Sequence, residues 1–385
     1  MKTHLLRKFV APEVVFGPEA RKLAGKYAAN LGAKNVLIVT DPGVIASGWL
    51  SDITLALDES GVSHNVFSGV SPNPRSREVM EGAAFYRERG CDAIVALGGG
   101  SPMDCAKGIG IVCYNNENIL KFEGVDKIKT PSPPLIFIPT TAGTSSDVSQ
   151  FTIILNESER TKIAIISKAI VPDVSLVDYQ TTLTMSPYLT ACTAIDALVH
   201  AIEAFVSIAA SPLTDIHALE AIRLISKNLT GAIDHAGNEE YKSAVMFASL
   251  EAGFAFSNAI LGAVHSMAHS AGGFLDLAHG ECNSILLEHV INFNYDSAPD
   301  RYGEIARAMG IASGRVSQPS DKNALIEKIK ELKKSVGITK TLGAVGVSSC
   351  DIGALARNAH NDPCLHTNPK RASVRDLEVI YEEAM

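Results

Sequence analysis

The chain has 385 residues, which at about 100–200 residues per domain suggests two domains. Its composition, with 46% hydrophobic and 20% charged residues, is that of a folded globular protein and excludes long disordered or collagen-like tracts. The net charge is −8, without a block of like charges, so we expect no nucleic-acid partner.

The cysteines and the N-terminus predict a cytoplasmic protein. Seven cysteines are scattered without a C-x-x-C pair, a pattern typical of reduced thiols. Arg7 and Lys8 interrupt the first apolar residues, so we expect no secretory signal. Ala252–Leu275 lacks Asp, Glu, Lys and Arg and could cross a bilayer by length, but its two histidines would be costly there. We therefore predict a buried helix in this stretch and no membrane partner.

The first half of the chain alternates short apolar runs with helical segments. Continuous apolar strands separated by helices predict a parallel sheet that is covered on both faces. The predicted strands are Asn35–Thr40, Asn65–Phe67, Ala93–Leu97 and Leu135–Ile138, and the predicted helices are Trp49–Ser60 and Ser76–Arg89. Further strand-like runs occupy Phe151–Leu155, Lys162–Ile166 and Val174–Val177.

From about residue 186 the pattern becomes helical. The predicted helices are Leu189–Val206, Pro212–His235, Lys242–His269 and Asp321–Val336, and no comparable strand follows them. This change predicts an α/β domain over residues 1–185 and an all-helical domain over residues 186–385.

Two loops that follow predicted strands have the composition of phosphate-binding loops. The turn Gly98–Asp104 precedes a helical segment, Cys105–Val112, and its three glycines would let backbone amides approach a diphosphate. The loop Pro139–Asp147 places five hydroxyl side chains around Gly143, a density that suits phosphate or ribose oxygens. Because ligands of parallel sheets bind beyond the carboxyl ends of the strands, the two loops favour a nucleotide site.

Two single residues have competing interpretations. Asp41 ends the first predicted strand, where a carboxylate could bind both hydroxyls of an adenosine ribose and favour NAD over NADP. It could equally form the turn before Pro42-Gly43. Lys162 could reach the nicotinamide-side phosphate or ribose, or it could be an ordinary solvated lysine at the start of a strand.

The helical half contains candidate metal ligands. Asp196 and His200 are four residues apart, and His265 and His269 repeat that spacing, so each pair projects from one helix face. His279 follows ten residues later. Buried imidazoles and a carboxylate need a partner, so we predict a divalent ion held by four of these five residues, which leaves one histidine for proton transfer. Mixed oxygen and nitrogen ligation suits Fe²⁺, Zn²⁺, Mn²⁺, Co²⁺ or Ni²⁺.

Together these motifs resemble the iron-containing (group III) alcohol dehydrogenases, the family of 1,3-propanediol dehydrogenase and lactaldehyde reductase. The resemblance covers essentially the whole chain and rests on GGGSPMD, PTTAGT, TACTAIDALVHAIEAFVS and GAVHSMAHSAGGFLDLAHG. It implies a Rossmann-like N-terminal domain that binds NAD and a C-terminal helical bundle that binds the metal. It also implies an active site in the cleft between them and a homodimer or a larger assembly of dimers.

Position by position, the resemblance also implies site residues. The implied metal ligands are Asp196, His200, His265 and His279, with His269 close to the metal as a proton relay. The implied NAD contacts are Asp41, Asn73, Gly99, Gly100, Ser101, Asp104, Thr140, Thr141, Thr144, Ser149 and Lys162. We expect the wall of the substrate pocket at Gln150, Phe151, Phe254, Phe256, Cys364 and His366.

These features predict reversible hydride transfer between NAD and a small primary alcohol or the corresponding short aldehyde, with the metal polarising the substrate oxygen. A glycerol-dehydrogenase-like or dehydroquinate-synthase-like enzyme is one alternative, but the spacing HSMAHSAGGFLDLAHG fits the iron-type branch better. A non-enzymatic nucleotide sensor with a structural metal is the other. Structural zinc often has thiolate ligands, and no cysteine accompanies these histidines, apart from Cys282 three residues after His279.

Overall fold

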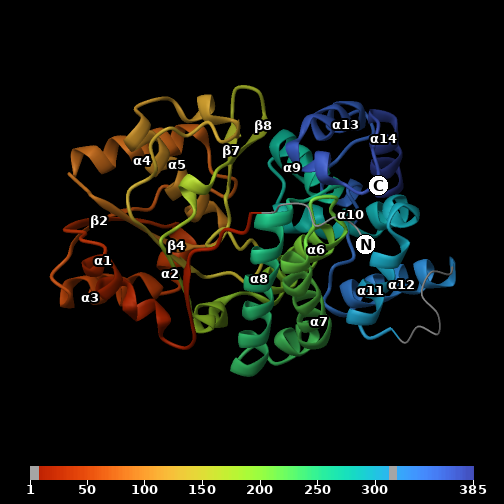
Figure 1. The fold of residues 1–385 in the computed structure, drawn as a ribbon, viewed down its shortest axis with the longest axis horizontal. Coiled ribbons are helices and arrows are strands. Elements are labelled where there is room, and N and C mark those ends of the chain that lie inside the picture. Colours follow the sequence, from red (N-terminus) through yellow and green to blue (C-terminus); the bar gives the residue numbers. More distant parts are fainter. Residues whose placement is uncertain (1–7, 312–318) are drawn as a thin grey trace.

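The computed structural model describes residues 8–311 and 319–385, and it has a sheet-containing part beside a helical part (Figure 1). In the described residues, all strands precede Asp178. Six of them form a parallel sheet in the order β1-β9-β6-β4-β2-β3. These strands are β1 (Glu13–Phe16), β2 (Asn35–Val39), β3 (Ser63–Phe67), β4 (Ala93–Gly98), β6 (Leu135–Pro139) and β9 (Val174–Val177).

Helices cover both faces of this sheet, as the continuous apolar strands predict. Leu37 and Val39 of β2 belong to a core shared with α4 and α5, whereas Val36 and Ile38 belong to a second core shared with α1 and α3. In Figure 1, α4 and α5 accordingly lie above β2 and β4, with α1 and α3 below them. The helices of this part are α1 (Ala24–Asn30), α2 (Pro42–Ala46), α3 (Trp49–Glu59), α4 (Ser76–Glu88) and α5 (Gly100–Asn115).

A second, three-stranded sheet has β5 before the second phosphate-binding loop in the chain order and β7 and β8 after it. It has the order β5-β8-β7, and β7 and β8 form an antiparallel hairpin. Its strands are β5 (Gly124–Val125), β7 (Phe151–Asn156) and β8 (Thr161–Ile166). The hairpin extends toward α9 of the helical part (Figure 1), so it brings Phe151 and Lys162 to the boundary between the two parts.

The helical part has one core, and α6 runs through its centre. From Thr190 to Val206 every residue of α6 is buried. The helix is apolar and long enough to span a bilayer, but 94% of its apolar window is buried inside the protein. The helices of this part are α6 (Pro187–Val206), α7 (Pro212–Asp234), α8 (Glu239–Ala259), α9 (Ala263–Leu275), α10 (His279–Asn294), α11 (Pro299–Ala308), α12 (Pro319–Ser335), α13 (Ile352–Asn361) and α14 (Val374–Glu383).

Short 3₁₀ helices connect many of these elements. They are η1 (Ala20–Leu23), η2 (Ile119–Phe122), η3 (Lys168–Ile170), η4 (Tyr179–Thr184), η5 (Tyr295–Ser297), η6 (Gly343–Val345) and η7 (Pro363–Thr367).

The prediction of one helix over Lys242–His269 is wrong. The chain breaks between α8 and α9, which meet at 98°. Ile260 has φ 61°, a conformation that is strained for a β-branched residue and ends α8. Glu203 of α6 then accepts a hydrogen bond from the amide of Val264 at 2.7 Å and caps the start of α9. The bend points His265 at Asp196 and Glu203 of α6, and most of Ala252–Leu275 is buried as predicted.

Candidate active site

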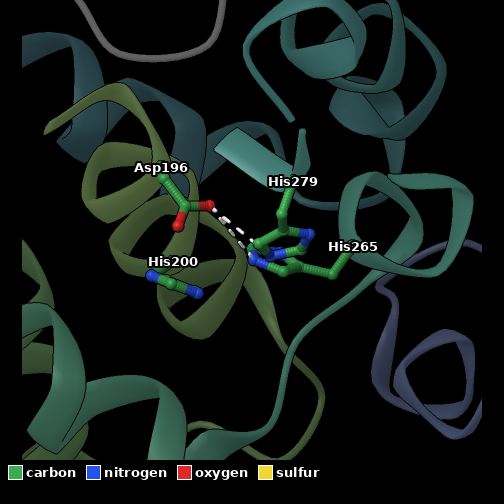
Figure 2. Close-up of side chains that lie close together, drawn as sticks. All are labelled: Asp196, His200, His265 and His279. Atoms are coloured by element: carbon green, nitrogen blue, oxygen red, sulfur yellow. Dashed lines mark ion pairs between the residues drawn. The ribbon is translucent and has the colours of Figure 1, made fainter. Parts of the chain in front are cut away.

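Four of the five predicted metal-binding candidates converge from three helices (Figure 2). Asp196 and His200 project from α6, His265 from α9, and His279 from the first turn of α10. Each offers one ligand atom, and these four atoms lie within 4.8 Å of one another. Oδ1 of Asp196 lies 3.7 Å from Nε2 of His265 and 3.8 Å from Nε2 of His279.

Hydrogen bonds behind the imidazoles orient two of them. Nδ1 of His265 lies 2.6 Å from Oε2 of Glu203, and Nδ1 of His200 lies 3.2 Å from the carbonyl oxygen of Gly143. Since carboxylates and carbonyls only accept, both Nδ1 atoms carry a hydrogen, so Nε2 is the nitrogen through which each ring would bind a metal. Nδ1 of His279 has no hydrogen-bond partner in the described part of the chain.

The chemistry of this donor set fits a divalent metal. Nδ2 of Asn283 lies 2.5 Å from Oδ1 of Asp196, 3.2 Å from Nε2 of His265 and 3.1 Å from Nε2 of His279. A donor that close to three acceptors marks a point on which their lone pairs converge. A cation would be held by the same lone pairs, and one carboxylate with three imidazoles suits iron, zinc and related divalent ions.

Burial and charge shift the pKa values of the four residues in different directions. Burial lowers the pKa of His200 to about 3 and lowers the pKa of His279 well below its ordinary value. Burial would also lower the pKa of His265, but hydrogen bonds to Asp196 and Glu203 outweigh it and raise the pKa to about 9. Burial would raise the pKa of Asp196, yet the imidazoles, His200 first, hold it well below its usual range. Without metal, one imidazole of the set is therefore protonated at neutral pH.

His269 stands beside the ligand set without joining it. Its ring stacks on that of His279, with centroids 5.3 Å apart. Its Nδ1 lies 2.9 Å from Oδ2 of Asp362. The contacts of Asp362 with His269 and with the amide of Cys364 together outweigh its burial and lower the pKa of this carboxyl group. Asp362 is therefore ionised and accepts the Nδ1 hydrogen, so Nε2 is the nitrogen of His269 that remains free.

The structure gathers all eleven predicted NAD contacts in two adjoining cavities. Both cavities are lined by Gly100, Ser101 and Thr144, so they adjoin at these residues. The outer cavity is also lined by Asp41, Gly99, Thr140 and Thr141. The inner cavity is also lined by Asn73, Asp104, Ser149 and Lys162, together with His200, His265, His269 and His279. Together the two cavities extend from the end of β2 to the metal-binding candidates.

The two interpretations of Asp41 turn out to be compatible. Its Oδ1 accepts a hydrogen bond from the amide of Val44 at 2.9 Å and caps α2. The same side chain lines the outer cavity, so its second oxygen can face a ribose. Lys162 is only partly exposed and lines the inner cavity. Burial lowers its pKa, which is not the behaviour of an ordinary solvated lysine.

A buried lysine fixes the two phosphate-binding loops to each other. Nζ of Lys107, on α5, donates to the carbonyl oxygens of Ser149 at 2.8 Å and Phe151 at 2.7 Å. Asp104, one turn earlier on α5, accepts a hydrogen bond from Oγ of Ser146 at 2.6 Å. The helix after the glycine turn therefore holds the second loop and the start of β7 in place.

The predicted substrate wall is only partly assembled. Phe151 and Phe256 line the inner cavity, and the ring of Phe256 stacks on that of His200 with centroids 4.3 Å apart. Phe254 does not line it and packs on Phe9 and His217 instead. Residues two apart on a helix point about 200° apart, so Phe254 and Phe256 could not share the site.

The other three predicted wall residues lie around the cavity rather than in it. Gln150 uses its side-chain amide to donate to the carbonyl oxygen of Ser257 at 2.8 Å. Cys364 is buried near Asp362, to which its backbone amide donates at 2.8 Å. His366 lines a neighbouring cleft that also reaches Lys162 and His269.

Three buried residues that support the site were not predicted from the sequence. For Glu203 and Asn283, the spacing in the sequence indicates a position near the metal ligands. Glu203 is three residues after His200, and Asn283 is four residues after His279, which places each on the helix face of a ligand. Asp362 had no such signal, because it lies 93 residues from His269.

Comparison with known proteins identifies the family of this chain. Residues 11–179 match the iron-containing alcohol dehydrogenase family, and residues 190–385 match the C-terminal part of the Fe-containing alcohol dehydrogenases. Alcohol dehydrogenase 4 of Schizosaccharomyces pombe is 40% identical, with 96% of this chain and 87% of the relative covered. The 1,3-propanediol dehydrogenase of Citrobacter freundii is 37% identical, with 98% of both chains covered.

Solved structures match equally closely. The crystal structure of a 1,3-propanediol oxidoreductase has a TM-score of 0.96 and 36% identity, covering 99% of this chain and 100% of the other. That of sulfoacetaldehyde reductase from Bifidobacterium kashiwanohense, in complex with NAD⁺, has a TM-score of 0.87 and 30% identity, covering 99% of both chains. The chain is therefore an oxidoreductase of the iron-containing alcohol dehydrogenase family.

Proposed function

We propose that the protein transfers a hydride reversibly between NAD and a small primary alcohol or the corresponding short aldehyde. The observation that carries this proposal is the pair of adjoining cavities. The outer cavity is lined by the glycine turn and Asp41, and the inner cavity is lined by the three imidazoles that converge with Asp196. Asp196, His200, His265 and His279 would hold the metal, with Fe²⁺ as the expected ion and Zn²⁺, Mn²⁺, Co²⁺ or Ni²⁺ as alternatives. When bound, the metal supplies a Lewis acid that polarises the substrate oxygen.

The two loops position the cofactor. The start of α5 after the glycine turn offers backbone amides to the diphosphate, and Asp41 would accept hydrogen bonds from the adenosine ribose. Lys162 and Ser149 line the inner cavity, close to the metal-binding candidates. They would orient the nicotinamide end, so that hydride donor and acceptor meet at the distance of about 3–3.5 Å that transfer requires.

His269 moves the proton. Asp362 fixes its Nδ1 hydrogen, so Nε2 can accept a proton during alcohol oxidation and return it during aldehyde reduction. The imidazole also lines the neighbouring cleft, which gives the proton a route away from the cofactor. Asp362 acts through His269 and is a positioning residue.

Apolar side chains surround the place where the substrate would bind. Phe151, Phe256 and Leu261 line the inner cavity and are all less than a tenth exposed. They exclude water from the reacting atoms and favour a short carbon chain. The physiological alcohol or aldehyde is to be found by assay among ethanol, butanol, 1,3-propanediol, lactaldehyde, methanol and sulfonated short aldehydes.

The experiment is a substrate panel with protein loaded anaerobically with Fe²⁺. NAD⁺ with each alcohol, and NADH with each aldehyde, are followed through the absorbance of NADH. We expect turnover with at least one short primary alcohol and none after His265→Ala, which removes a proposed ligand. No turnover with any member of the panel, or undiminished turnover by metal-free His265→Ala, would contradict the proposal.

The proposal also covers the cellular compartment, the oligomeric state and the domain division of the protein. We propose a cytoplasmic homodimer, or an assembly of dimers, with the division into residues 1–185 and 186–385 given above. All seven cysteines are free thiols, which supports a reducing compartment. Analytical ultracentrifugation measures the assembly, and a monomer at working concentration would contradict it.

A further inference from the structure

Asn283 is a buried amide at the centre of the metal-binding candidates. It lies on α10 one turn after His279, and its side chain has no exposed surface. Its Nδ2 contacts Asp196, His265 and His279 at 2.5–3.2 Å. Its Oδ1 has no hydrogen-bond partner among the residues that the structure describes. A buried polar group that lacks a partner costs about 1–3 kcal/mol, so the core alone would be served better by an apolar side chain.

The orientation of the amide follows from Asp196. An ionised carboxylate only accepts hydrogen bonds, so at 2.5 Å the NH₂ end must face Oδ1 of Asp196. The same nitrogen lies 3.2 Å from Nε2 of His265 and 3.1 Å from Nε2 of His279. Once a divalent ion engages the lone pairs of these imidazoles, Asp196 is the acceptor that Asn283 keeps.

We propose that Asn283 is a positioning residue for the metal site: its amide donates a hydrogen bond to Oδ1 of Asp196 and fixes the direction in which that carboxylate faces the ion. The inference rests on the metal site of the proposed function. It gives Asp196 an orienting partner, as Glu203 is for His265 and the carbonyl oxygen of Gly143 is for His200. Such outer contacts fix the direction of a ligand, and their loss typically costs 10–100-fold in metal affinity.

The test uses Asn283→Leu, which keeps the approximate size of the side chain and removes the donor. The matched control is Ser284→Ala, because the neighbouring Ser284 is equally buried but donates only to the carbonyl oxygen of Gly280 at 2.6 Å. Co²⁺ is titrated into metal-free full-length protein against a chelator, and the visible d–d absorption of the Co²⁺ protein is recorded. These bands report the geometry of the ligands and do not depend on turnover.

We expect Asn283→Leu to bind Co²⁺ about 10–100-fold more weakly and to shift its d–d bands, while Ser284→Ala matches the wild type in both. Wild-type affinity together with a wild-type spectrum in Asn283→Leu would overturn the inference. The inference would also be overturned if Asn283→Leu bound Co²⁺ more weakly with unchanged d–d bands and the metal-free variant melted at a lower temperature. The weaker binding would then come from a less stable fold. If the wild type itself bound no Co²⁺, Fe²⁺ or Zn²⁺, the metal site of the proposed function would fail, and the two failures are thereby distinguished.

Discussion

Glu203 accepts a hydrogen bond from Nδ1 of His265 at 2.6 Å while its other oxygen caps the start of α9. One buried carboxylate on α6 thus sets both the bend that delivers His265 and the ring nitrogen that His265 presents. Together with Asp196 it brings two negative charges to the site, which balance those of a divalent ion. In this arrangement the geometry of the fold and the charge of the site depend on the same side chain.

Glu203→Gln should weaken metal binding about 10–100-fold. Glutamine can still accept from Val264, but its NH₂ would face Nδ1 of His265, and two donors cannot bond. The imidazole would then place its hydrogen on Nε2, which removes the lone pair needed by the metal. Glu251→Gln is the matched control, because Glu251 forms an equally short contact with His217 away from the site. Chelator competition measures both, and equal affinities for the two variants would refute this role of Glu203.

Metal affinity should rise with pH and level off near pH 9. The pKa of His265 is raised to about 9 in the metal-free protein, so below that pH the metal must displace a proton, and affinity should change about tenfold per pH unit. The sign for stability is opposite. The raised pKa of His265 contributes to the free energy of unfolding of the metal-free protein. This contribution is fully present below the pKa of an unfolded histidine, about 6.5, and is lost as the pH rises through 9. Affinity measured on both sides of pH 9 checks the prediction, which a flat profile would contradict.

The sequence was sufficient wherever a local pattern determines structure. The strands β2, β4 and β6 are continuous apolar runs, and each was predicted to within two residues at either end. The i, i+4 spacing of Asp196 with His200 needs only the geometry of α6. The glycine turn could likewise be located because it follows a buried strand.

The sequence was insufficient where contacts with distant elements determine where a helix ends or which way a side chain points. The break between α8 and α9 depends on Glu203 and on Asn368, whose Oδ1 accepts a hydrogen bond from the amide of Ala263 at 3.2 Å. Neither partner is visible in the apolar run that was predicted as one helix. None of the four residues of β1 is fully buried, and the strand is placed by its pairing with the distant strand β9. Phe254 and Phe256 are both aromatic, and the orientation of α8 against its neighbours decides that only Phe256 lines the inner cavity.

His269→Ala should retain the metal and slow turnover about 10²–10⁴-fold, the usual contribution of a positioned acid or base. His269 donates to Asp362 and is outside the four converging ligand atoms, so metal content should stay at the wild-type level. The pH profile of kcat should change with it. Asp362→Asn keeps the shape of the side chain and removes its charge, so its kcat should lie between that of the wild type and that of His269→Ala. Metal analysis and steady-state kinetics over pH check this, and wild-type kinetics in His269→Ala would remove the relay.

Asp41→Ser should improve the use of NADP relative to NAD by about tenfold, equivalent to about 1.4 kcal/mol. The carboxylate at the outer cavity would repel a 2′-phosphate, and serine removes its charge. Serine also remains a good N-cap for the amide of Val44, so stability should hold. Asp41→Ala separates the two roles, since it removes the same charge but should lose about 1 kcal/mol of stability with the cap. An unchanged ratio of kcat/KM for the two cofactors in both variants would reject the assignment.

Gly143→Ala should weaken both the fold and the metal site. A Cβ at Gly143 would lie 2.4 Å from the carbonyl oxygen and 2.6 Å from the Cβ of Thr193, and both atoms are held by α6. Relief of this overlap must push the loop away from α6, at a typical cost of about 1–3 kcal/mol. The carbonyl oxygen of Gly143 would move with the loop and release Nδ1 of His200. Gly69→Ala is the control, because its nearest neighbour would be 3.8 Å away. Thermal unfolding and chelator competition should separate the two variants, and a Gly143→Ala protein with wild-type melting temperature and metal affinity would show that this close approach is not what orients His200.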